Sequence, residues 1–251
     1  MTINQPANHQ IPALRRLWKQ AFGDPDAFIE SFFREGFTPD HCRCIWEDNQ
    51  LAAALYWFDC RCKEQRLAYI YGVATDTAYR HKGYCHALME DALHHLTALG
   101  YVGAILVPAG EKLRMFYKNM GFCDFGGIRE FTCLRGGQAI HLQKISAEEY
   151  ARLRPDFLPA ESVLQTGKTL SFLSAYTEFY AGENVLFTLY REDETAFVAE
   201  LLGDSSVADA ILKTLHLPSG RFRVPGADPF AMCRPLSEHF QEPCYFGLAL
   251  D

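Results

Sequence analysis

The chain has 251 residues, of which 49% are hydrophobic and 22% charged, and this composition excludes a disordered or fibrous protein. A chain of this length forms one large domain or two smaller ones and buries a core without disulfides or metal ions. Its 24 basic and 31 acidic side chains give a net charge of -7, which argues against a nucleic-acid-binding protein because such proteins usually carry a basic face.

The sequence has no apolar run long enough to predict a membrane span. The first residues are polar and lack the basic-then-apolar order of a signal peptide. The nine cysteines are scattered without the spacing of a secreted domain, so we expect free thiols in a reducing compartment. The sequence therefore predicts a cytoplasmic protein that binds neither nucleic acid nor a membrane.

Four of the cysteines form two closely spaced pairs, at Cys42, Cys44, Cys60 and Cys62. Zinc sites more often have two to four residues between paired cysteines. The segment around the first pair also has the pattern of a β-hairpin that turns at residues 47–50. With Trp46 opposite Leu51, Cys44 would lie opposite Ala53, and the second pair would lie beyond this pairing. The four thiols would then not converge, and we expect no metal site.

Apolar spacing and turn residues predict a mixed α/β domain over residues 1–134. Its second helix has Asp24 as the expected N-cap and Pro25 in the first turn. In chain order the predicted elements are a helix over residues 10–22, a helix that ends at Gly36, a hairpin between residues 42 and 62, a buried strand over 67–75, a helix that ends near Gly100, a strand over 102–107, a helix over 111–120 and a strand over 122–134.

A second, smaller α/β domain is predicted over residues 135–251, after a glycine pair at residues 136 and 137. Its net charge is near -6, against -1 for residues 1–134. The predicted elements are a helix with a capping box at Ser146 that stops before Pro155, a helix over 169–181, a hairpin over 185–191 and 195–202 that turns at residues 192–194, a helix over 205–215, and strands around Phe222, Met232 and Phe246.

The segment Arg80–Cys85 joins the buried strand to the next helix and carries the chemistry. A helix N-terminus offers free backbone N–H groups and a partial positive charge. Gly83 would let a phosphate approach the backbone, and Arg80 and Lys82 add full positive charges. These features favour a diphosphate site, although a solvated loop is the alternative interpretation of these residues alone. The spacings of a Walker loop and of a dinucleotide-binding fingerprint are both absent.

At this point the residues resemble a known family. The pattern Val73-Ala74-Thr75, four residues, then Arg80-x-x-Gly83-x-Cys85 is similar to motif A of the GCN5-related N-acetyltransferases (GNAT). Downstream, Tyr117-x-x-x-Gly121-Phe122 resembles the family's Tyr-x-x-x-Gly-Phe signature. The resemblance covers about residues 8–134, and two motifs in register are more specific than either alone.

The resemblance implies a mixed, mostly antiparallel central sheet flanked by helices, and a second half similar to the degenerate half of tandem members. It implies acetyl-CoA as acyl donor, with the pantetheine arm along a strand edge from which the strand over 102–107 has splayed away. Tyr117 would protonate the leaving thiolate or hydrogen-bond its sulfur. The residues implied for binding the donor are Val73, Ala74, Thr75, Arg80, His81, Lys82, Gly83, Tyr84 and Cys85.

The sequence departs from the family pattern in three places. Cys85 stands where the motif has glycine or alanine, and we expect it to be a buried, unreactive thiol. Gly110 replaces an asparagine found in many members. Tyr69 and Tyr71 stand where many relatives have a glutamate as general base, so the proton acceptor is left open between a water chain, a backbone carbonyl, a tyrosine and an acid of the other half.

The resemblance therefore implies an N-acetyltransferase in which a primary amine attacks the thioester directly in a ternary complex. The acceptor is a small-molecule or peptide amine that the sequence does not identify. The alternative is a non-catalytic CoA-binding or ligand-sensing protein. The oligomeric state stays open, a homodimer included. The second half lacks an Arg-x-x-Gly loop, so we expect it to wall the acceptor pocket, where Glu200 and Asp204 would favour a cationic amine. We expect His94 and His95 to be surface residues.

Overall fold

The computed structural model describes residues 1–192 and 195–250 and separates them into two compact units. Unit 1 comprises Met1–Cys123 and Cys233–Gln241, and unit 2 comprises Asp124–Met232 and the residues from Glu242 onward. This division differs from the predicted boundary after residue 134 in two ways. Unit 2 begins eleven residues earlier, because the strand over 123–134 pairs with a strand of unit 2, and a short C-terminal segment returns to unit 1.

Unit 1 contains one sheet with the strand order β1-β2-β3-β4-β5, antiparallel except for the parallel pair β4 and β5. The predicted elements of the first half are confirmed, and β1 is an addition that the sequence did not indicate. The elements are β1 (Thr2–Asn4), α1 (Ile11–Phe22), α2 (Asp26–Ser31), β2 (Cys42–Glu47), β3 (Gln50–Cys62), β4 (Gln65–Thr75), α3 (Tyr84–Ala98), β5 (Gly103–Leu106) and α4 (Glu111–Lys118).

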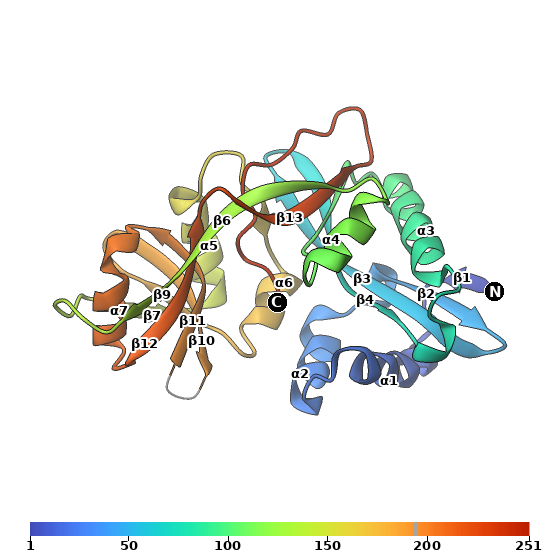
Figure 1. Ribbon diagram of the computed structural model, residues 1–251, viewed down its shortest axis with the longest axis horizontal. Helices are drawn as coiled ribbons and strands as arrows, with labels where there is room; N and C mark the ends of the chain where they lie inside the picture. Colours follow the sequence, from blue (N-terminus) through green and yellow to red (C-terminus); the bar gives the residue numbers. More distant parts are fainter. Residues whose placement is uncertain (193–194, 251) are drawn as a thin grey trace. The chain divides into compact units, whose positions relative to one another are not determined.

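The two faces of this sheet are covered by different helices (Figure 1). On one face, the ring of Trp18 from α1 lies 5.5 Å from Tyr56 of β3 and 5.6 Å from Tyr71 of β4. On the other face, His95 of α3 lies 5.9 Å from Trp57, the next residue of β3, because successive strand side chains point to opposite faces. The expectation that His94 and His95 are surface residues is thus wrong for His95, which is half-buried and whose pKa is lowered by burial.

The turn between α1 and α2 differs from the prediction. Helix α1 ends at Gly23, whose φ of 75° is left-handed. Asp24 does not cap α2, because its carboxylate accepts a hydrogen bond from Trp18 Nε1 at 2.7 Å and Pro25 occupies the N-cap position. Asp24, whose residue type is typical of an N-cap, thus bonds back to α1 and fixes the buried indole of Trp18.

The hairpin of β2 and β3 has the predicted pair Trp46–Leu51, but a bulge follows it. The bulge shifts the register by one residue, so that Cys44 lies opposite Ala54 rather than Ala53. The Sγ atoms of Cys42 and Cys44 are 3.6 Å apart on one strand, and burial holds the pKa of Cys42 well above its usual value. Within residues 1–192 and 195–250, no three His, Cys, Asp or Glu side chains group as metal ligands would.

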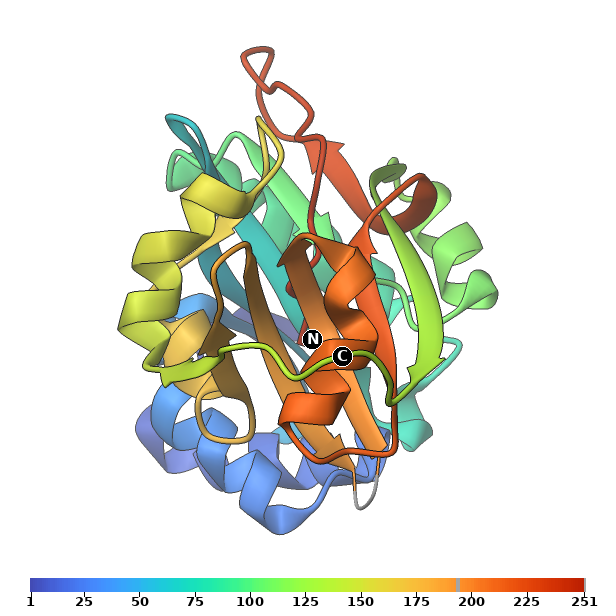
Figure 2. The same ribbon diagram turned by 90° about the vertical axis from the view of Figure 1, so that its left-hand side faces the viewer.

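The strands of unit 2 pair in the order β6-β12-β11-β10-β9-β7, and of these pairs only β11 and β12 run parallel (Figure 2). The strand pairing in each unit thus confirms the predicted mostly antiparallel architecture. The elements are β6 (Cys123–Leu134), β7 (Gln143–Ile145), α5 (Ala147–Phe157), β8 (Leu164–Gln165), α6 (Lys168–Leu173), β9 (Glu178–Ala181), β10 (Val185–Glu192), β11 (Thr195–Gly203), α7 (Ala208–Thr214), β12 (Ser219–Pro225) and β13 (Asp228–Pro235), whose last three residues belong to unit 1.

Helix α7, drawn in orange in Figure 2, packs through Ile211 and Leu212 against a core that includes Phe187, Val198 and Phe222. Three predictions for this unit are wrong. Helix α5 continues through its proline to residue 157, the segment over 169–181 is a helix followed by a strand, and the segment around residue 246 is not a strand. The predicted turn of the β10–β11 hairpin lies partly at residues 193–194, outside the described residues.

Across the described chain, no helix combines the length and the apolar character that crossing a membrane requires.

The packing of Trp18 leads to a test of unit 1. Trp18 is 2% exposed and contacts five other aromatic rings, so we expect Trp18→Ala to lower the free energy of unfolding by about 3–5 kcal/mol. Urea unfolding followed by circular dichroism measures this change. The control is Leu99→Ala at a residue that is 44% exposed, for which we expect a change within about 0.5 kcal/mol. Equal losses for both variants would contradict the packing described.

Candidate active site

An open strand edge lies at the end of β4. The parallel pairing of β4 with β5 covers Leu67 to Tyr69, where Tyr69 is opposite Ile105. Strand β5 ends one residue later, whereas β4 continues to Thr75. Among the described residues, no β5 residue therefore pairs with Val73–Thr75, and the backbone groups on this edge are the candidates to pair with an added strand or ligand.

A bulge in β4 lies immediately before this open edge. Ala54 of β3 is opposite Ala74, but Tyr56 is opposite Tyr71, so Leu55 faces two residues of β4. Gly72 takes a φ of 60°, and a Cβ there would lie 2.9 Å from the ring of Tyr56. Both the left-handed conformation and the close ring require glycine. This bulge was not predicted, and its one signal in the sequence is a glycine inside a strand pattern.

A tight turn connects β4 to α3. The carboxylate of Asp76 accepts a hydrogen bond from Ala78 N at 2.8 Å, and Arg80 Nε donates to the carbonyl of Thr75 at 3.2 Å. Both bonds are local, so the chain leaves the open strand edge and reaches the helix within a few residues. Arg80 is exposed and its guanidinium keeps further donors for a ligand.

The start of α3 has the backbone geometry of an anion site. His81 and Gly83 both take left-handed conformations, with φ of 62° and 81°. Gly83 is the N-cap, makes no side-chain cap, and its carbonyl accepts the first helical bond from Ala87 N at 3.0 Å. The backbone N–H groups of residues 83–85 therefore have no partner within the helix. A Cβ at Gly83 would meet no heavy atom within 4 Å, so the approach to these groups is open.

The side chains around this helix start fall into two groups. His81 and Lys82 are exposed, and Lys82 Nζ lies 5.1 Å from the ring centroid of Tyr79. The Tyr84 hydroxyl instead donates to Glu47 Oε2 at 3.1 Å, and burial raises the pKa of this tyrosine. The side chain of Tyr84 thus fixes α3 to β2, and only its backbone N–H is left for a ligand.

Cys85 and Tyr117 are neighbours behind the helix start. Burial raises the pKa of Cys85 to about 11, so this thiol is protonated at neutral pH, as expected for an unreactive thiol. Tyr117 is 7% exposed, and burial raises its pKa, with a further contribution from Cys85. Its ring lies 5.4 Å from Phe116 and 5.9 Å from Phe122. Tyr117 is therefore a fully protonated phenol at any physiological pH.

The face of β4 that would carry a general base is aromatic. Tyr69 and Tyr71 lie 6.1 Å apart, and Phe58 packs against both at 6.4 and 5.9 Å. Trp18 and Phe32 cover the same side of the sheet. Since β4 contains no aspartate or glutamate, its side chains bring no carboxylate to this place.

Glu200 of unit 2 has a different role from the one expected. Its carboxylate is fully buried and accepts hydrogen bonds from Arg154 Nε at 2.7 Å and from Arg154 Nη2 at 2.9 Å. The hydroxyl groups of Tyr150 and Tyr245 donate to the same carboxylate at 2.6 and 3.2 Å. The expectation that Glu200 attracts a cationic amine is wrong, because Arg154 already neutralises it. Asp204 caps a local turn by accepting hydrogen bonds from Ser206 Oγ at 2.7 Å and from Ser206 N at 2.9 Å, and these bonds lower the pKa of Asp204.

Comparison with known proteins agrees with this geometry. Residues 2–123 match the family model described as an acetyltransferase (GNAT) domain, whereas none of the curated proteins matches the chain. The whole chain has the fold of several solved structures at low identity. A GCN5-related N-acetyltransferase from Kribbella flavida is 17% identical with a TM-score of 0.71, and the alignment covers 93% of this chain and 70% of that one.

Two further structures extend this fold likeness. A GCN5-related N-acetyltransferase from Anabaena variabilis is 14% identical with a TM-score of 0.70, covering 94% of this chain and 73% of that one. A putative acetyltransferase from Pyrococcus horikoshii is 15% identical with a TM-score of 0.67, covering 98% and 93%. Residues 2–123 thus match an acetyltransferase (GNAT) domain, in agreement with the resemblance carried by the two motifs, and the solved structures share the fold.

The buried pair of unit 2 leads to a stability prediction. Arg154→Met leaves the Glu200 carboxylate buried without its counter-charge, so we expect a loss of about 3–5 kcal/mol in the free energy of unfolding. Urea unfolding measures it. The matched control is Arg152→Met on the same helix. Arg152 pairs with Glu149 but is 69% exposed, so we expect a loss below about 1 kcal/mol. A small loss for Arg154→Met would show that the pair is not sealed from water.

The raised pKa of Cys85 leads to a labelling prediction. A thiol with a pKa near 11 gains its reactive thiolate only as the pH rises toward that value, so Cys85 should react slowly with iodoacetamide at pH 7.5 and faster with each unit of pH above it. Mass spectrometry of the labelled peptides measures the rates. Cys123 and Cys244 are exposed and serve as internal controls. Labelling of Cys85 as fast as these at pH 7.5 would contradict its burial.

Proposed function

We propose that the chain transfers an acetyl group from acetyl-CoA to a primary amine by direct attack in a ternary complex. One observation carries this proposal, namely that the open edge of β4 at Val73–Thr75 leads within a few residues to the uncapped start of α3. A linear donor with amides at one end and a diphosphate at the other is complementary to this succession of backbone groups. A GNAT acetyltransferase domain matched over the same residues supports the choice of acetyl-CoA.

In the proposed donor site, backbone groups make the main contacts with the donor, and cationic side chains add to them. The pantetheine amides would pair with Val73–Thr75 as an added strand does. The diphosphate would lie on the N–H groups of residues 83–85, where the helix dipole favours negative charge. Arg80, His81 and Lys82 would surround it from the exposed side. The open space at Gly83 fits a phosphate oxygen close to the backbone.

The reaction then requires three elements. Backbone N–H groups beside the bulge at Val73 would polarise the thioester carbonyl as charge develops on its oxygen. The neutral amine attacks the carbonyl carbon, a C–N bond forms, and the C–S bond breaks. The sulfur takes up a proton, and Tyr117 is suited to donate it because burial keeps its phenol protonated. Strand β4 brings no carboxylate, so the amine would lose its proton to water, a backbone carbonyl, a tyrosine or an acid from elsewhere in the chain.

Thiol release from acetyl-CoA across a panel of primary amines tests this function. We expect Tyr117→Phe to lower kcat by about 10²-fold with little change in KM for acetyl-CoA, since a donated proton matters only in the transition state. Because the pKa of Tyr117 is raised, the wild-type rate should not fall as the pH rises to 10. Tyr180→Phe in unit 2 is the control and should leave kcat unchanged. CoA binding without thiol release for every amine would overturn transfer and leave a CoA-binding protein.

A further inference from the structure

Unit 1 is completed by a segment from the far end of the chain. Residues Cys233–Gln241 belong to this unit although the matched acetyltransferase domain ends at residue 123. Leu236 N donates to the carbonyl of Val102 at 2.9 Å, just before β5 begins. The side chain of Gln65 makes two hydrogen bonds with the backbone of Gln241. Gln65 Nε2 donates to the Gln241 carbonyl at 3.0 Å, and Gln241 N donates to Gln65 Oε1 at 2.7 Å. The segment is thus hydrogen-bonded to the first residue of β4 and to the residue that precedes β5.

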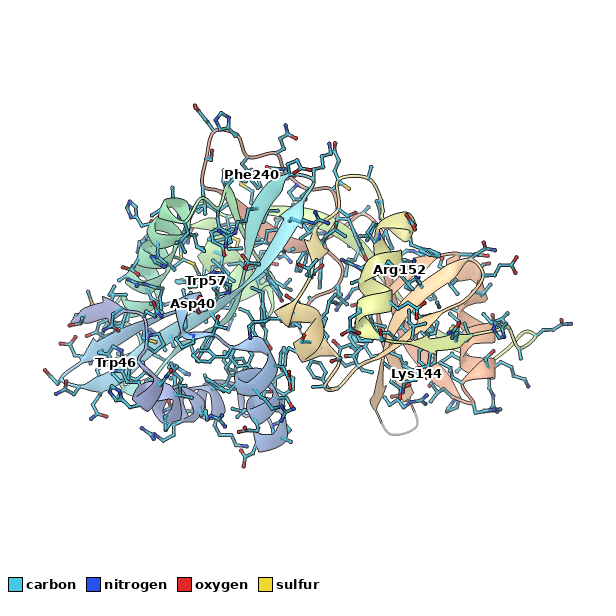
Figure 3. All side chains as sticks on the ribbon, turned by 180° about the vertical axis from the view of Figure 1, so that it is seen from behind. Asp40, Trp46, Trp57, Lys144, Arg152 and Phe240 are labelled. Carbon is cyan, nitrogen blue, oxygen red and sulfur yellow. The ribbon has the colours of Figure 1, made fainter. Side chains whose placement is uncertain are left out.

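Residues 233–241 also pack against unit 1 through apolar side chains. Phe240, labelled in Figure 3, lies directly against Gly103 of β5. A Cβ at Gly103 would come within 2.4 Å of the Phe240 ring, so glycine at this position makes room for the returning chain. Cys233, at the start of the segment, is 1% exposed. These contacts make the segment a fixed part of unit 1.

Within this segment, the guanidinium of Arg234 joins two helices. Its Nη1 donates to Glu90 Oε1 at 2.6 Å and to the carbonyl of Met120 at 2.8 Å, and its Nη2 reaches Glu90 Oε2 at 3.4 Å. Glu90 lies on α3, and Met120 lies just beyond the end of α4. The hydrogen bond from Arg234 lowers the pKa of Glu90, so both groups are charged at neutral pH. A carbonyl at a helix C-terminus carries partial negative charge and is a good partner for the same cation.

The turn that Arg234 holds is the one that follows Tyr117. The carbonyl of Tyr117 accepts hydrogen bonds from Met120 N at 3.0 Å and from Phe122 N at 3.1 Å. Between them, Gly121 takes a φ of 78°, and a Cβ there would lie 3.6 Å from Arg234 Nε. The glycine that ends α4 thus lies directly beside the guanidinium. Arg234 thus bonds directly to the turn whose backbone N–H groups donate to the carbonyl of Tyr117.

We propose that Arg234 is a positioning residue that holds α4, and with it Tyr117, against α3. This inference rests on the proposed role of Tyr117 as proton donor. Proton transfer depends on donor placement to within a fraction of an ångström, and a shift of about 1 Å can cost about 10²-fold in rate. Arginine suits this position because its planar fork reaches a carboxylate and a carbonyl at once, which a lysine ammonium does with less fixed geometry.

Amide hydrogen exchange tests whether Arg234 holds α4. Arg234→Met keeps the length of the side chain and removes its donors, so exchange over residues 111–122 should quicken by about 10-fold or more, while α1 of the same unit stays unchanged. Arg234→Lys should recover part of the protection. Arg152→Met in unit 2 is the matched control and should leave residues 111–122 unaffected. Unchanged exchange in Arg234→Met would overturn the proposal.

A double-mutant cycle tests the link to Tyr117. The measured quantity is thiol release from acetyl-CoA with the most active primary amine of the panel, or with water alone if none accelerates it. If Arg234 positions Tyr117, Tyr117→Phe should cost about 10²-fold in the wild-type background and less than about 3-fold in Arg234→Met, because the two residues act as one unit. Glu90→Gln should lower kcat in the same direction without removing Arg234, which guards against a folding defect of the arginine variant.

The outcomes separate the two proposals. The same loss from Tyr117→Phe in both backgrounds would overturn the positioning role of Arg234 and leave Tyr117 as the donor. No loss from Tyr117→Phe in the wild-type background would overturn Tyr117 as donor and, with it, any catalytic role for Arg234. A purely structural role predicts lower thermal stability with an unchanged cost of Tyr117→Phe, whereas positioning predicts that this cost itself shrinks.

Discussion

The candidate site depends on one constraint, the early end of the pairing between β4 and β5. Backbone N–H and C=O groups on an open strand edge need partners, and a sheet that stops pairing in mid-strand leaves them for water or a ligand. The bulge at Gly72 turns the strand at the same place, and the next turn delivers the chain to the uncapped start of α3. One continuous stretch of about a dozen residues therefore contains both the strand edge and the helix N-terminus to which the proposed donor would bind, with cationic side chains at its exposed side.

The parts of this site that the sequence predicted are those in which the signal is local. The glycine of the loop, the two cations beside it and the apolar spacing of α3 all act on their own neighbours, so the position of the helix start was predictable from residues 80–85 alone. The bulge was not, because it exists only relative to the register of β3. The same limit explains the hairpin of β2 and β3, whose turn pair was predicted correctly while a bulge displaced Cys44 by one residue.

Long-range partners account for the remaining differences. Glu200 reads in the sequence as one more acid on a surface strand, and only its partner Arg154, 46 residues earlier, makes it a buried ion pair. The charge pattern and the residue spacing of the sequence do not predict such a long-range ion pair. Asp24 is a smaller example, since a residue type typical of an N-cap bonds to the indole of Trp18 instead. In both cases the sequence shows a polar side chain but does not show the partner to which it bonds.

The return of residues 233–241 changes what the domain boundary means. The matched acetyltransferase domain is continuous in sequence, yet the compact unit that contains it is not, because Gly103 and the turn after α4 have their packing partners at Phe240 and Arg234. Gly103 of β5 leaves space for the Phe240 ring from the far end of the chain, and a Cβ there would also come within 3.1 Å of Leu67. At Gly103 and Gly121, the matched domain thus packs against residues 233–241 of the C-terminal segment. The sequence motif Tyr-x-x-x-Gly-Phe ends a helix by left-handed backbone geometry, and in this protein the same glycine is also the place where unit 1 is closed by the C-terminal segment.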